Sequence, residues 1–191
     1  MEFRLGGARV RVSFFFLLLL TLFLLQDSFQ LAPILLFSML FHELGHLVLL
    51  ILWGKRITGL NLTPFGIGIT TPSTTHLSYG KEISIVLAGP LMNFLLAGGL
   101  LLLPNGELAS AINLVMGLFN LLPILPLDGG QALHFWTEGR GGAGRWLAYG
   151  ITAMALAFLY GMSIFWAVRG KGYGMLCACL FLTIQLLRRT Q

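Results

Sequence analysis

Six long apolar stretches limit the folds that are open to this chain. They lie roughly at Ser13–Leu25, Leu31–Trp53, Ile83–Leu103, Leu108–Leu125, Trp146–Val168 and Tyr173–Leu187. A helix needs about 17–25 apolar residues to cross a bilayer, so the first and last stretches are short for a span. Only 10% of the residues are charged and 57% are hydrophobic, whereas soluble domains are about one quarter charged. This composition excludes a soluble globular protein, a disordered chain and a nucleic-acid-binding module, and predicts a multi-pass protein of the cell membrane.

The first stretch has the basic flank of a signal peptide, because Arg4, Arg9 and Arg11 precede it. No small-x-small cleavage site follows in Gln26–Ser28, which favours an uncleaved first span.

The basic residues predict the orientation of the spans. If both termini are cytoplasmic, ten of the twelve lie inside and only Arg169 and Lys171 lie outside. The inside set is Arg4, Arg9, Arg11, Lys55, Arg56, Lys81, Arg140, Arg145, Arg188 and Arg189. Cytoplasmic loops are enriched in Lys and Arg, so this orientation is favoured over its inverse.

The longest non-spanning segment is Gly54–Glu82, and part of it has a β-like pattern. Within Ile57–Thr71, Ile67 and Ile69 alternate with Gly66 and Gly68 after Pro64, which favours strands or a hairpin over a helix. We therefore expect an all-α polytopic membrane protein, with about six transmembrane helices and a small β-hairpin or strand region after the second helix. We expect residues 1–191 to form a single domain.

Ionisable groups are costly in lipid, and here they concentrate in two short segments. The first is the apolar segment Phe41–His46, which contains His-Glu-Leu-Gly-His. On a helix, His42 and His46 share one face, and Glu43 points toward the remaining position of a metal that both histidines bind. By composition, chance alone would give this motif on the order of 0.002 times in such a chain. The pattern predicts one Zn²⁺ per chain, with Glu43 as the general base toward a zinc-bound water.

A catalytic zinc needs a third protein ligand. Cys177 and Cys179 could serve, but they lie on the short last stretch and fit packing roles better. His76 and His134 lie in polar stretches and fit solvated side chains. Asp128 is the strongest candidate, because it is the second acidic residue that belongs to an apolar stretch.

The chain before Asp128 supports that choice. Pro123 and Pro126 remove backbone donors and break the helix, and Gly129 and Gly130 permit an abrupt turn. Irregular backbone at membrane depth is tolerated where it lines a wet cavity, so Asp128 is expected to point into a pocket.

A third segment, Ala88–Asn93 in the third stretch, contains small residues, a proline and a buried amide. Asn93 needs hydrogen-bond partners, which could come from helix packing or from support of the site.

The three segments together resemble the site-2 protease family of intramembrane zinc metalloproteases, and most closely its sporulation branch. The resemblance runs through His-Glu-Leu-Gly-His, Ala-Gly-Pro-Leu-Met-Asn and Asn-Leu-Leu-Pro-Ile-Leu-Pro-Leu-Asp-Gly-Gly. It implies that His42, His46 and Asp128 bind zinc and that Glu43 is catalytic. It also implies that Asn120 and Pro126 lie near the substrate, and we add Asn93 as a candidate substrate contact. The chain departs from the family in showing neither a CBS nor a PDZ domain, so regulation through such domains is not implied.

The function expected from these features is zinc-dependent cleavage of a transmembrane or membrane-tethered protein by metal-activated water. The substrate would be a membrane protein and not a nucleic acid, and the sequence does not give the oligomeric state. Three alternatives stay open: a membrane protease of the other HExxH type with a third Glu ligand, a transporter or ion relay that uses buried His, Glu and Asp, and an inactive binding homologue.

Overall fold

The structure is a computed structural model that describes residues 2–5, 8–26, 31–63, 66–70, 77–138, 140–170 and 173–189. Most of these residues are helical. The helices are α1 (Phe14–Gln26), α2 (Leu31–Leu52), α3 (Tyr79–Leu100), α4 (Glu107–Asn120), α5 (Asp128–Glu138), α6 (Gly141–Val168) and α7 (Gly174–Arg189). The strands are β1 (Glu2–Leu5), β2 (Ala8–Val12), β3 (Gly59–Thr63) and β4 (Gly66–Thr70).

Three of the described helices, α2, α3 and α6, are long and apolar enough to cross a membrane. They have 22, 22 and 28 residues. The six predicted stretches all contain helices, but α1, α4 and α7 have only 13, 14 and 16 residues, which is less than the usual spanning length of about 17. The six-span expectation is therefore supported for three of its members.

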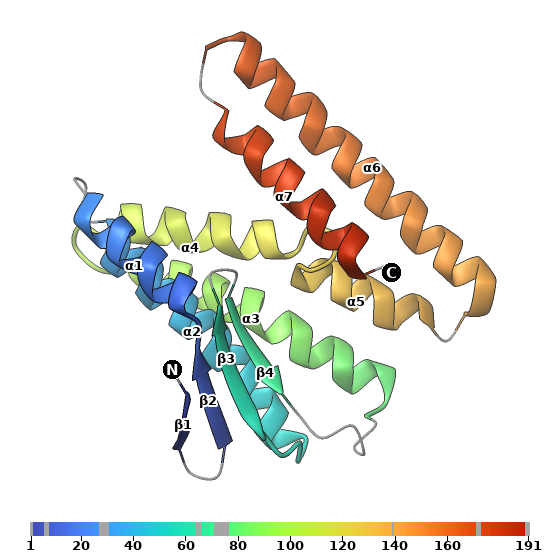
Figure 1. Cartoon of the computed structure of the whole chain (residues 1–191), viewed down its shortest axis with the longest axis horizontal. Helices are drawn as coiled ribbons and strands as arrows, with labels where there is room; N and C mark the ends of the chain where they lie inside the picture. Colours follow the sequence, from blue (N-terminus) through green and yellow to red (C-terminus); the bar gives the residue numbers. More distant parts are fainter. Residues whose placement is uncertain are drawn as a thin grey trace.

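Helices α2, α3 and α4 pack side by side, with α3 also contacting α5 (Figure 1). Small residues allow the close approach of α2 and α3. A Cβ on Gly45 would come within 2.7 Å of Met92 Cγ and would overlap the backbone of Ala88. Between α3 and α4, Ser110 Oγ donates a hydrogen bond to the Ala97 carbonyl at 2.8 Å. Such small-residue contacts and interhelical hydrogen bonds are what hold helices together in lipid.

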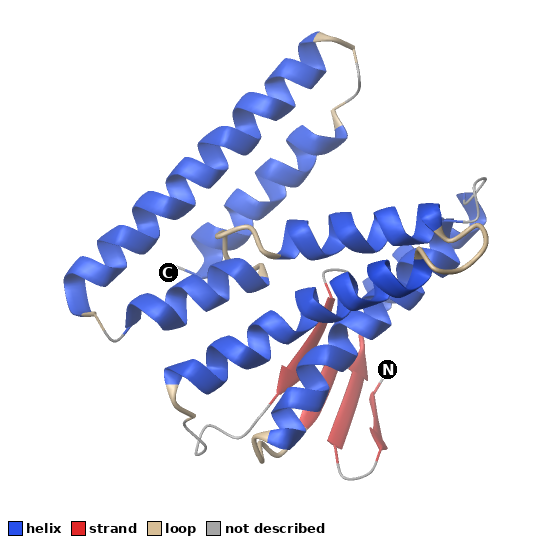
Figure 2. Ribbon diagram, turned by 180° about the vertical axis from the view of Figure 1, so that it is seen from behind, coloured by secondary structure: helices blue, strands red, loops and turns tan. Residues whose placement is uncertain are grey.

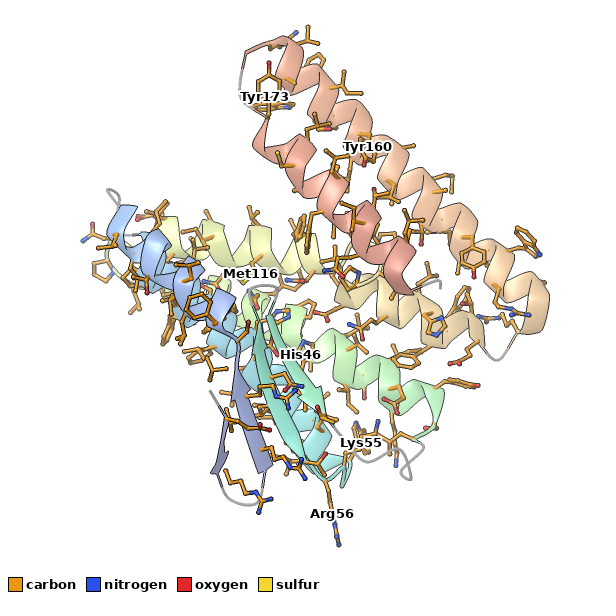
Figure 3. The ribbon with its side chains drawn as sticks, viewed as in Figure 1. His46, Lys55, Arg56, Met116, Tyr160 and Tyr173 are labelled. Carbon is orange, nitrogen blue, oxygen red and sulfur yellow. The ribbon has the colours of Figure 1, made fainter. Side chains whose placement is uncertain are left out.

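The carboxyl end of α2 is joined to the start of α3 by polar contacts. Lys55 Nζ lies 2.6 Å from Glu82 Oε1, and Trp53 Nε1 donates to Ser84 Oγ at 3.0 Å. Lys81 Nζ lies 4.6 Å from the centre of the Trp53 ring. Figure 3 shows Lys55 and Arg56 at this end of α2, with Arg56 pointing away from the rest of the molecule.

The strands form one four-stranded sheet in the order β1-β2-β3-β4. β1–β2 and β3–β4 are antiparallel hairpins, and β2 pairs with β3 in parallel through the crossover made by α1 and α2. Cross-strand partners share a face of the sheet, so Arg11 lies beside Asn61 and Val10 beside Leu60. Figure 2 shows the sheet alongside α2 at one end of the molecule, while α6 and α7 extend at the other.

The predicted hairpin after the second helix is confirmed as β3 and β4. The sheet is larger than expected, because the basic amino-terminal segment adds β1 and β2. The all-α description was incomplete for a physical reason: Arg9 and Arg11 alternate with Val10 and Val12, and this amphipathic strand completes its hydrogen bonds on β3.

Helix α5 was not predicted. Gly129 and Gly130 do not make a turn but lie in the first turn of this helix. A side chain at either position would collide with backbone, of Leu121 in the case of Gly129 and of Ile124 in the case of Gly130. The glycines therefore allow the helix to start directly against the irregular segment 121–127, which carries the predicted break after α4.

Candidate metal centre

The two histidines of the motif lie one turn apart on α2, and Asp128 reaches them from the first residue of α5. His42 Nε2 lies 3.0 Å and His46 Nε2 lies 3.5 Å from Asp128 Oδ2. The two Nε2 atoms lie 3.2 Å from each other. All three residues form one cluster of potential metal ligands, and Figure 3 shows His46 near the middle of the molecule.

Each imidazole is held through its other ring nitrogen. His42 Nδ1 lies 3.0 Å from Asn93 Oδ1, and His46 Nδ1 lies 2.8 Å from the Ile85 carbonyl oxygen. Both partners are acceptors, so each Nδ1 carries a proton, and in the neutral ring Nε2 then presents its lone pair. The two α3 contacts thus fix the tautomer in which an imidazole can bind a metal.

When each Nδ1 carries the only proton of its ring, the converging atoms are two nitrogen lone pairs and a carboxylate oxygen, all of which can bind a metal. Asp128 is only 7% exposed, and its Oδ2 is a buried atom without a hydrogen-bond partner in the described part of the chain. Unprotonated atoms of this kind would repel one another in a buried place, and a metal cation between them would remove that repulsion. The donor set fits Zn²⁺, since ligands about 2.0–2.2 Å from a tetrahedral zinc are about 3.3–3.6 Å apart.

Gly89 of α3 lies directly against the two histidines and leaves room for their side chains. A Cβ at this position would overlap Nε2 of both His42 and His46. The backbone of α3 therefore passes directly against the histidines, and only glycine leaves room for a metal in front of them.

The position of Asp128 depends on the irregular segment 121–127. Gln131 Nε2 donates to the Pro126 carbonyl at 3.1 Å, and Thr152 Oγ1 of α6 donates to the Pro123 carbonyl at 2.8 Å. Neither Gln131 nor Thr152 was singled out from the sequence, because nothing in their local pattern indicates which distant carbonyl they serve.

The other predicted site residues lie around this centre. Glu43 is half-buried on α2, directly after His42. Asn120 is the last residue of α4 and is half-buried, with its Nδ2 donating to the Met116 carbonyl at 3.0 Å. Pro126 is also half-buried. Asn93 is fully buried and hydrogen-bonded to His42, a placement that does not favour contact with a substrate.

The alternative ligands do not join the cluster. Among the described residues, the ligand group consists of His42, His46 and Asp128 alone. His134 and Cys177 are exposed, and Cys179 is buried as a free thiol on α7. His76 lies outside the described residues.

A family model described as Peptidase M50B-like matches residues 15–127. Stage IV sporulation protein FB of Bacillus subtilis is 32% identical over 133 residues, which are 65% of this chain and 46% of that protein. A zinc metalloprotease of Methanocaldococcus jannaschii is 33% identical over 108 residues, which are 51% of this chain and 31% of that protein. The chain thus spans less than half the length of these curated relatives.

Among solved structures, the site-2 protease from Methanocaldococcus jannaschii has a similar fold, with a TM-score of 0.69. The match covers 100% of this chain and 95% of that one, at 24% sequence identity.

Proposed function

This chain belongs to the Peptidase M50B-like family, and from that membership and the metal centre we propose that it is a zinc-dependent intramembrane endopeptidase. The observation that carries the proposal is the buried convergence of His42, His46 and Asp128, whose potential ligand atoms lie 3.0–3.5 Å apart. The names of its relatives support the chemistry, since they include a zinc metalloprotease.

In this proposal, His42, His46 and Asp128 would hold one zinc ion. When bound, zinc polarises a peptide carbonyl and lowers the pKa of a coordinated water toward about 7. His42 and His46 contribute neutral nitrogens and Asp128 one negative charge, so the site keeps a net positive charge toward an electron-rich carbonyl. Three protein ligands leave a fourth position open, as catalytic zinc sites do.

Glu43 acts as the general base and then as the general acid. Its carboxylate accepts a proton from the attacking water and delivers that proton to the amine that leaves when the peptide bond breaks. Glu43 suits this role because it follows His42 on α2 and is half-buried and not sealed in the core.

The proposed substrate is a transmembrane or membrane-tethered segment of another protein. A helix hides its peptide bonds in its own hydrogen bonds, so the substrate must unwind before attack. Strand β4 is at the edge of the described sheet and could receive the unwound chain by strand addition, which replaces the lost hydrogen bonds. Asn120 and Pro126, at the two ends of the break before Asp128, are the proposed substrate contacts.

We further propose that residues 1–191 act as one catalytic unit in the cell membrane with both termini in the cytoplasm. Two facts support this: the centre draws on α2, α3 and α5, and the basic residues favour that orientation.

The experiment is incubation of purified protein in liposomes with a panel of single-span membrane proteins, read by mass spectrometry of the fragments. Cleavage that stops when a chelator removes zinc, and resumes when zinc is restored, is the expected result. Cleavage that continues at full rate in zinc-free protein would overturn the proposal.

A further inference from the structure

The two metal-binding imidazoles are oriented by acceptors of different kinds. His46 donates to a backbone carbonyl, that of Ile85, whereas His42 donates to a side chain, the amide oxygen of Asn93. A backbone acceptor is present whatever the residue. The orientation of His42 therefore depends on one amino-acid choice, at a position 51 residues away in the sequence.

Asn93 is placed to act on His42 and not on a substrate. It is 0% exposed, and it contacts Nδ1, the ring nitrogen that faces away from the metal centre. Its own Nδ2 is a buried atom without a hydrogen-bond partner in the described residues. Burying an unpaired amide donor costs free energy. The fold carries this cost at Nδ2 while Oδ1 makes the hydrogen bond to His42.

The orientation of the amide follows from the chemistry of the ring. For His42 to bind a metal through Nε2, its proton must lie on Nδ1, and the Nδ1–H group then needs a hydrogen-bond acceptor. Asn93 supplies that acceptor with Oδ1 and leaves Nδ2 pointing away. A turned amide would present a donor to Nδ1 and would favour a proton on Nε2, where the metal must bind.

From these observations we propose that Asn93 is a positioning residue, which fixes the metal-binding tautomer of His42 by accepting a hydrogen bond from its Nδ1–H. The inference rests on the proposed function, because it takes His42 as a zinc ligand. Asn93 is outside the group of potential metal ligands, so it would act on the metal only through His42. Loss of such an outer acceptor typically weakens metal binding about 10–100-fold.

The chain offers a matched control in Asn113 of α4. This asparagine is also buried, at 1% exposure, and one of its amide atoms also has no partner in the described residues. Its Nδ2 donates to Ser38 Oγ at 2.8 Å, one turn before His42 on α2. Asn113→Leu therefore removes a buried amide beside the same helix without removing a contact to a ligand.

The test is a zinc-affinity titration against a competing chelator for the wild type, Asn93→Leu, Asn93→Asp and Asn113→Leu. Asn93→Leu should bind zinc about 10–100-fold more weakly. Asn93→Asp should restore the affinity, because a carboxylate oxygen accepts the same hydrogen bond from Nδ1–H. Asn113→Leu should keep the wild-type affinity even if it unfolds at a lower temperature.

A spectrum separates positioning from general damage to the fold. The visible absorption of Co²⁺-loaded protein reports ligand geometry, so it should change in Asn93→Leu and be wild-type in Asn93→Asp and Asn113→Leu. Equal zinc affinity and equal spectra for the wild type and Asn93→Leu would overturn the inference. If Asn93→Leu does not fold, failure of Asn93→Asp to reproduce the wild-type affinity and spectrum overturns it instead.

The metal content of Asp128→Ala distinguishes this inference from the proposed function. If Asp128→Ala loses zinc and Asn93→Leu does not, only the role of Asn93 is wrong. If Asp128→Ala keeps its zinc, the assigned metal centre itself is wrong.

Discussion

At the scale of single residues, the centre is defined as much by what holds the ligands as by the ligands themselves. The motif on α2 gives the spacing of His42 and His46, but their tautomers come from acceptors on α3. The position of Asp128 comes from glycines that permit α5 to start against irregular backbone. Of these three features, only the spacing of His42 and His46 is determined by residues close together in the sequence.

Removing the carboxylate from the cluster should remove most of the zinc. Asp128→Ala leaves two nitrogen ligands, and a two-ligand site holds zinc poorly. Elemental analysis of the purified variant should show far less than the roughly one zinc per chain that we expect for the wild type. Full zinc in this variant, together with zinc loss in Cys177→Ala or His134→Ala, would mean that the third ligand lies elsewhere.

A single methyl group at Gly89 should block the centre. Gly89→Ala places a Cβ where it overlaps Nε2 of both histidines, so zinc binding and cleavage should both be lost. The matched control is Gly98→Ala on the same helix, where a Cβ would meet no atom within 4 Å. Zinc content and thermal unfolding, measured on both variants, check the claim, which fails if Gly89→Ala binds zinc as tightly as Gly98→Ala does.

At the scale of elements, the sequence predicted what depends on local pattern. The helix carrying His42 and His46, the hairpin after it and the break at Pro123–Pro126 all follow from residues close together in the chain, and the structure has all three. Strand β2 was missed because its parallel partner β3 lies beyond two helices. Helix α5 was missed because its two early glycines disfavour a helix locally, and their value lies in the close approach they allow.

The ion pair between the ends of α2 and α3 should contribute to the stability of this helix pair. Lys55 and Glu82 are only 11% and 18% exposed in their side chains, so removing one charge leaves the other poorly solvated. Glu82→Gln should lower the free energy of unfolding by about 1–3 kcal/mol. Thermal unfolding in detergent is the measurement, with the exposed Glu107→Gln as the control.

A charge swap tests whether the pairing itself matters. The double variant Lys55→Glu with Glu82→Lys should recover part of the stability that either single change removes, because an ion pair is possible again. If the double variant is no more stable than the less stable of the two single variants, the ion pair does not stabilise the pair of helices α2 and α3.

At the scale of the whole molecule, the helices that carry the candidate metal ligands can be distinguished from the helical hairpin of α6 and α7. Helices α2 and α5 carry the ligands, and α3 carries the hydrogen-bond acceptors of the two histidines. Helices α6 and α7 pair with each other, and a hydrogen bond of 2.9 Å joins Tyr160 Oη to Thr183 Oγ1. Figure 3 shows Tyr160 between these two helices, away from His46. Membrane crossing by the shorter helices could not be predicted from apolarity alone, because length and neighbouring helices decide it.

The orientation is open to direct measurement. With both termini cytoplasmic, reporter fusions after Arg189 and at Asn105 should report opposite sides of the membrane, as the ten-to-two distribution of basic residues implies. A carboxyl terminus on the outer side would mean that one of the short apolar helices does not cross.

The central claim is that Glu43 moves the proton in a zinc-dependent cleavage, and one comparison tests it most directly. Glu43→Gln changes a carboxylate to an amide of similar size and leaves the three proposed ligands intact. The measurement is cleavage of a single-span substrate that the wild type cuts, in liposomes, with the zinc content of both proteins determined in parallel. The account predicts equal zinc in both proteins and a rate lower by about 10²–10⁴-fold in the variant, the usual effect of losing a general base. Equal zinc-dependent cleavage by both proteins would contradict it.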